Sequence, residues 1–161
     1  MTNRPNSNSA QASDVEIMTF RRSEDLPSWM TRDQVAAGFH EKMKPYQDTL
    51  EDVNRALDYA FVEGKGQGGF LVTATREKEL LGALLMLRTG MGGYVPANIL
   101  LFVWVDPVLR GRGIGRSIID KALAETDGDV KLHVEMDNPA KRLYERIGFS
   151  TKYAEMRYKR Q

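Results

Sequence analysis

A glycine-rich turn follows the most apolar run of the chain and could bind a phosphate. Residues Ile99 to Val105 are all apolar, Asp106-Pro107 stops the run, and Arg110-Gly-Arg-Gly-Ile-Gly115 comes next. The apolar residues that follow recur at helical spacing: Ile114, Ile118, Ile119 and Leu123. The pattern predicts a strand buried on both faces, a tight turn and a helix. The free N–H groups and the dipole of such a helix suit an anionic phosphate.

The glycine spacing narrows the kind of phosphate site. A dinucleotide-binding turn needs a third glycine three residues after the second, but Gly111, Gly113 and Gly115 are spaced by two and position 116 is Arg. The Gly-Lys-Ser/Thr of a P-loop does not occur in the chain. The motif that fits is Arg-x-x-Gly-x-Gly after a strand that ends in Val-Asp-Pro. It resembles motif A of the GCN5-related N-acetyltransferases (GNAT), whose turn holds the pyrophosphate of coenzyme A. The alternative is an ordinary strand, turn and helix with solvated arginines.

A second motif of the same family follows. The segment Asn138-Pro-Ala-Lys-Arg-Leu-Tyr-Glu-Arg-Ile-Gly-Phe149 resembles GNAT motif B, although Asn138 to Tyr144 is one residue shorter than the commonest spacing. The strand at 99–105 also carries no Glu, where many relatives place their base. The two motifs lie in the family's order and together cover residues 98–149.

The resemblance implies which residues bind acetyl-CoA. Backbone groups of Val103, Trp104 and Val105 would pair with the pantetheine arm. The pyrophosphate would lie on the N–H groups of Gly111, Arg112, Gly113, Ile114, Gly115 and Arg116. The side chains of Arg110 and Arg112 would add charge. Arg116 is expected to contribute its backbone, with its side chain turned to solvent as the favoured interpretation. Asn138 and Tyr144 complete the predicted cofactor-binding set.

The catalytic residues are predicted from the chemistry of acetyl transfer. Tyr144 is the candidate acid for the departing thiolate, and the alternative is a core tyrosine packed beside Leu143 and Ile147. His133 and Glu135, on one face of a predicted strand, are the candidate bases. The alternatives are a structural histidine, a solvated or ion-paired glutamate, and water as the base. Upstream lies a set of aromatic and methionine residues that either belong to the hydrophobic core or line the pocket for the acceptor: Trp29, Met30, Phe39, Met43 and Tyr46.

The patterns elsewhere predict the remaining elements. Strands are expected at 14–22, 70–75, 80–88, 99–105, 130–135 and 149–159. Helices are expected after a cap at Ser28 or Thr31, after Thr49, after the glycine turn, and from Asn138 to Gly148. The fold class is α/β (α+β): a GNAT-like mixed, mostly antiparallel central sheet flanked by helices, in the order β-α-α-β-β-β-α-β-α-β.

Composition limits the partners. The chain has 161 residues, a net charge of +1 and no cysteine. One N-acetyltransferase domain is expected at 14–161, behind a polar, disordered tail at 1–13. We expect no nucleic-acid partner, no membrane segment and no metal, and a cytoplasmic location. A homodimer is one option for the assembly.

The function that these observations predict is acyl transfer. The chain is expected to move an acetyl group from acetyl-CoA to a primary amine of a small molecule, amino acid or peptide, by direct transfer through a ternary complex. The alternative is a non-catalytic module that binds or senses acyl-CoA. Tyr144 favours the enzyme, because a binding module has no need of a proton donor.

Overall fold

A mixed sheet forms the centre of the computed structural model, which describes residues 14–63 and 67–161. Within these residues the strands lie in the order β1 to β5, and each pairs with its neighbour in sequence. The first four strands are antiparallel, whereas β5 runs parallel to β4. Their bounds are Glu16–Phe20, Gly69–Arg76, Glu79–Arg88, Asn98–Val105 and Val130–Leu132. The predicted fold class is confirmed, and the tail expected at 1–13 lies outside the described residues.

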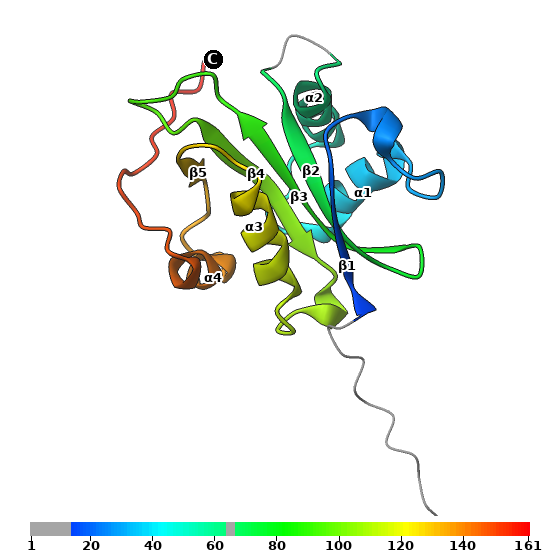
Figure 1. Cartoon of the computed structure of the whole chain (residues 1–161). Helices are drawn as coiled ribbons and strands as arrows, with labels where there is room; N and C mark the ends of the chain where they lie inside the picture. Colours follow the sequence, from blue (N-terminus) through cyan, green and yellow to red (C-terminus); the bar gives the residue numbers. More distant parts are fainter. Residues whose placement is uncertain (1–13, 64–66) are drawn as a thin grey trace, which may run out of the picture.

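Helices cover both faces of the sheet (Figure 1). On one face lie α1 (Arg32–Lys42) and α2 (Leu50–Phe61), and on the other lie α3 (Ile114–Ala124) and α4 (Ala140–Ile147). Each face has its own buried apolar core. β4 contributes to both cores, which is why its sequence is apolar without interruption.

The predicted caps start the first two helices. The Thr31 side chain accepts from the Gln34 N–H while Gln34 caps the Thr31 N–H in return, which makes a capping box before α1. The Thr49 hydroxyl accepts from the Asp52 N–H and begins α2.

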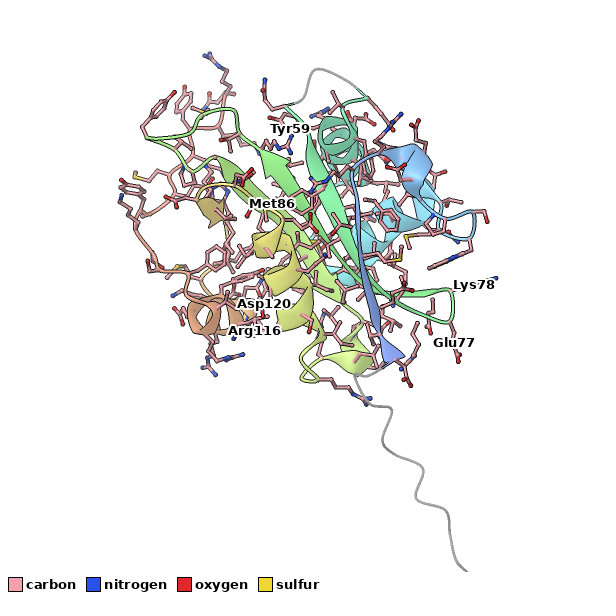
Figure 2. The ribbon with its side chains drawn as sticks, viewed as in Figure 1. Tyr59, Glu77, Lys78, Met86, Arg116 and Asp120 are labelled. Carbon is pink, nitrogen blue, oxygen red and sulfur yellow. The ribbon has the colours of Figure 1, made fainter. Side chains whose placement is uncertain are left out.

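The strands expected at 70–75 and 80–88 are confirmed as β2 and β3, and a tight hairpin joins them. Glu77 and Lys78, at its tip in Figure 2, both have positive φ. Two such residues give a turn whose twist matches that of the flanking strands.

One predicted strand is shorter than expected and another is wrong. β5 ends at Leu132, so His133 and Glu135 follow the strand instead of lying on it. Residues 149–159 form no strand although their polarity alternates. Their Tyr153, Met156 and Tyr158 side chains are exposed. Alternation stabilises a strand only where a sheet edge and an apolar surface receive it, and this segment passes outside β5 without pairing (Figure 1).

Candidate active site

A gap opens between β4 and β5 in the second half of β4. The two strands pair only from Asn98 to Leu100, opposite Val130 to Leu132. The register between β3 and β4 shifts at the same point, because Leu85 pairs with Phe102 and Met86 with Leu100. The extra residue is a β-bulge, which bends and twists its strand. Residues 101–105 therefore have a strand on one side only.

Two residues of β4 turn their backbone groups into this gap. The Asp106 N–H donates to the Leu81 carbonyl at 2.8 Å. Because hydrogen-bonding directions alternate along an antiparallel pair, Trp104 also faces β3, whereas Val103 and Val105 face the gap. Of the three predicted residues, Val103 thus presents its N–H and C=O groups and Val105 its N–H group to a ligand, whereas the Val105 carbonyl accepts from Arg110. Trp104 is buried on the other face of the sheet, against α1.

The glycine turn lies directly beyond β4 and is open to solvent. Gly111 and Gly113 have φ of 77° and 83°, which favours glycine. A Cβ atom at either position would meet no atom within 4 Å. α3 begins at Ile114, so the N–H groups of Ile114, Gly115 and Arg116 have no acceptor within the helix. Unpaired N–H groups beneath an open surface fit an anionic phosphate.

The three arginines of this turn lie differently. Arg110 donates to the carbonyls of Val105 (Nε, 3.3 Å) and Lys42 (Nη2, 3.4 Å). The Arg112 side chain is exposed and has no partner within the described part of the chain. Arg116 pairs with Asp120 one helical turn later, with Nε to Oδ2 at 3.1 Å, and Figure 2 labels both side chains on α3. Because this pair engages the Arg116 side chain, only the backbone N–H of Arg116 is left to contribute to the turn.

α1 is bound to the same end of β4. Gly38 lies against the Trp104 ring so closely that a Cβ there would be 2.8 Å from a ring carbon. The Lys42 ammonium lies 3.1 Å from the Asp106 carboxylate. These contacts fix the end of α1, from which the segment of Tyr46 continues, at the end of β4.

Tyr144 lies on the α4 side of the gap. Its ring is buried, and it packs edge-on against Phe149 with centroids 5.9 Å apart. Burial, with a smaller effect from the Glu135 carboxylate, raises the pKa of Tyr144 to about 12. The phenol therefore stays protonated at neutral pH and keeps a proton to donate.

Glu135 is the predicted base whose charge acts on Tyr144. Its charge raises the pKa of that phenol, and it contributes to the raised pKa of Tyr46, after burial and Asp137. His133 and Glu135 are both exposed, and His133 acts on a different carboxylate. The pKa of Glu155 is lowered mainly by Arg157, and His133 lowers it further. The structure thus separates the two candidate bases by their neighbours.

Asn138 starts α4. Its Oδ1 accepts from the Ala140 N–H at 2.9 Å, and its carbonyl accepts from the Lys141 N–H at 3.1 Å. The helix expected from Asn138 begins at Ala140, which is within the usual spread of helix ends. The Asn138 oxygen is therefore occupied by the cap.

Sequence reasoning missed Asp137 and placed Tyr46 only in a general apolar set. Asp137 adjoins Asn138, and that proximity to motif B was the available signal. The rest of the apolar set lies in the core below α1 and α2 or packs against it: Trp29, Met30, Phe39 and Met43.

Among residues 14–63 and 67–161, no three His, Asp or Glu side chains are grouped to hold a metal ion. No helix in the same ranges has the length and apolarity to span a bilayer.

The chain is similar to known acetyltransferases in sequence. The family model of the acetyltransferase (GNAT) domain matches residues 65–151, more than half of the chain. Mycothiol acetyltransferase from Acidothermus cellulolyticus is 29% identical over 152 residues, which cover 84% of this chain and 45% of the relative. The chain spans about half the length of the curated relatives it matches.

Solved structures share the fold. An integron cassette protein from the mobile metagenome of V. cholerae superposes with a TM-score of 0.63 at 18% identity, covering 92% of this chain and 93% of that one. An aminoglycoside N-acetyltransferase in complex with CoA superposes with a TM-score of 0.61 at 13% identity, covering 91% and 95%. Since the family model matches the segment that carries the gap, the glycine turn and Tyr144, the chain belongs to the GNAT acetyltransferase family.

Proposed function

We propose that this chain is an acetyl-CoA-dependent N-acetyltransferase that moves the acetyl group directly to a primary amine within a ternary complex. The observation that carries the proposal is the gap beside Val103 and Val105, flanked by the open glycine turn and by Tyr144 with Glu135. Backbone groups, an anion site and a proton donor are the parts that acetyl transfer from a thioester requires.

The chain's groups fit acetyl-CoA in two places. Val103 and Val105 would bind the pantetheine arm as an added strand, because their hydrogen-bonding groups have no neighbouring strand. The N–H groups from Gly111 to Arg116 would bind the pyrophosphate, and the exposed Arg112 guanidinium would add charge there.

Bound acetyl-CoA supplies the acetyl group as a thioester. An N–H of β4 polarises the carbonyl oxygen, so that the amine nitrogen forms its bond to the acetyl carbon as the carbon–sulfur bond breaks. Tyr144 gives its proton to the departing sulfur. Glu135, directly or through water, accepts the proton that the amine loses.

The acceptor side of the gap is acidic. Burial raises the pKa of the Tyr46 phenol, and the charges of Asp137 and Glu135 raise it further. Two carboxylates would attract an ammonium ion, and Glu135 could then remove its proton. Relatives named mycothiol acetyltransferase and a structural neighbour named aminoglycoside N-acetyltransferase make a small-molecule amine the first acceptor to test.

The test is the release of free CoA thiol from acetyl-CoA in the presence of amines. The panel contains aminoglycosides, amino sugars, amino acids and short peptides, with an amine-free reaction as background. We expect saturable, amine-dependent release for at least one acceptor. Tight acetyl-CoA binding without release above background for any acceptor would instead assign the chain as a non-catalytic acyl-CoA-binding module.

A further inference from the structure

A second hollow lies at the far end of the sheet from the glycine turn. It has a volume of about 300 Å³ and lies where β3 ends, β4 begins and α3 has ended. The 11 residues of α3 separate it from the turn by roughly 16 Å. None of the residues assigned above to acetyl transfer lines it.

Asn98 gives the hollow a hydrogen-bond acceptor that has no donor. The side chain lines the hollow although Asn98 is only 4% exposed. Its Nδ2 donates to the carbonyls of Asp127 at 2.7 Å and Asp129 at 3.3 Å, which fixes the orientation of the amide. No described residue donates a hydrogen bond to Asn98 Oδ1, and this atom is accessible from the hollow. A buried amide oxygen in this state favours a ligand N–H group.

Two opposite charges line the same hollow without neutralising each other. Neither Arg88 nor Asp127 makes a side-chain ion pair with any residue that the structure describes. The backbone of Arg88 is nevertheless fixed, because its N–H donates to the Gly68 carbonyl and its carbonyl accepts from the Tyr59 hydroxyl at 2.7 Å. Tyr59 is labelled at this end of the molecule in Figure 2. The backbone of Arg88 is thus held in place, and its guanidinium is available to a ligand.

The other charged side chain of the lining is already engaged. The Glu125 carboxylate lies 2.7 Å from Arg21 and 2.9 Å from Lys121. Asp127 is therefore the free carboxylate of the hollow, and it lies just beyond the C-terminal end of α3. The negative end of the helix dipole adds to the attraction for a cation there.

We propose that this hollow binds a small zwitterion with the chemistry of a free α-amino acid. The ammonium would lie on Asn98 Oδ1 and Asp127, and the carboxylate would pair with the Arg88 guanidinium. The volume is at the lower end of the range for small-molecule pockets, which suits a ligand of this size. The proposal does not depend on acetyl transfer and concerns a site apart from the acceptor.

Calorimetric titration of the whole chain with L-alanine, glycine and L-leucine tests the proposal. Ethylamine and propionate each keep one charge of L-alanine and lose the other. We expect saturable binding of at least one amino acid, and binding at least about tenfold weaker for both single-charge analogues, because each loses a charge-assisted hydrogen bond. No saturable binding of the three amino acids into the millimolar range would overturn the proposal.

Variants locate the binding. Arg88→Gln and Asp127→Asn should each weaken L-alanine binding at least about tenfold. Glu135→Gln, at the acceptor side, and Arg55→Gln, on the exposed flank of α2, should leave it unchanged. Both hollow variants alter exposed side chains, and circular dichroism checks that they fold. Weakening by Glu135→Gln alone would place the amino acid at the acceptor side and refute the second site.

Discussion

The Lys42 ammonium lies 3.1 Å from the Asp106 carboxylate, and this contact joins the last residue of α1 to the residue after β4. Asp106 also accepts from the Val108 N–H at 3.1 Å, which caps the short 3-10 turn Pro107–Leu109 leading to the glycines. One carboxylate therefore positions both the segment of Tyr46 and the turn expected to hold the pyrophosphate.

Replacing Asp106 should separate its two roles. Asp106→Ala loses the cap and the ion pair and should lower the free energy of unfolding by about 1–2 kcal/mol. Asp106→Asn keeps a capping oxygen and should cost less. Lys42→Gln removes only the partly exposed pair and should cost under about 1 kcal/mol. Urea denaturation measures all three, and an equal loss in the Ala and Asn variants would contradict the capping role.

The same carboxylate predicts a pH dependence. Burial acts to raise the pKa of Asp106, but the Val108 N–H and Lys42 outweigh it and hold that pKa below its usual 3.8. A depressed carboxyl pKa stabilises the fold above the unfolded value, and this stability is lost as the pH falls through the folded pKa. The difference in unfolding free energy between wild type and Asp106→Asn should have its full size near about pH 6 and should become smaller below about pH 3.8. A difference that is equal at both pH values would refute this account.

Replacing Gly113 should weaken acetyl-CoA binding in addition to straining the backbone. Gly113→Ala puts a methyl group where the ligand is expected and forces a side chain to φ of 83°. Gly93→Ala is a matched control, because Gly93 has φ of 102° and equally open surroundings far from the turn. Both variants should lose about 1 kcal/mol of stability, but only Gly113→Ala should raise the acetyl-CoA Kd. The same Kd in both variants would remove the turn from the site.

The two candidate bases should behave differently. Glu135→Gln should reduce kcat/KM for the amine at least about tenfold, since the charge of Glu135 acts on both Tyr144 and Tyr46. His133→Gln should change it little, because His133 lies beside Glu155 instead. Steady-state kinetics with saturating acetyl-CoA decides between them. A larger loss in His133→Gln would reverse the assignment.

The parts of the site that could be predicted are local in sequence. An uninterrupted apolar run predicted β4, and the glycine spacing predicted the turn and the start of α3. Thr31 and Thr49 marked the beginnings of α1 and α2, because a cap is formed within four residues.

The parts that could not be predicted depend on packing between distant segments. The approach of α1 to β4 is set by Gly38 against the Trp104 ring, and neither residue reveals the other in the sequence. The association of Tyr46 with Asp137 follows from that approach. Alternating polarity predicted a strand at 149–159, but alternation does not show whether a sheet edge is there to pair with it.

Tyr144→Phe tests the central claim, that Tyr144 protonates the departing thiolate in the gap between β4 and β5. The variant keeps the ring and its contact with Phe149, and the hydroxyl has no hydrogen-bond partner within the described residues, so the fold should survive. Tyr94→Phe, at an exposed loop position, is the matched control.

The measurement is kcat together with the acetyl-CoA Kd for Tyr144→Phe. The account predicts a fall in kcat of roughly 10²–10⁴-fold with Kd nearly unchanged, because the hydroxyl acts only as charge develops on sulfur. A kcat within about twofold of wild type, under conditions where chemistry limits turnover, would contradict it.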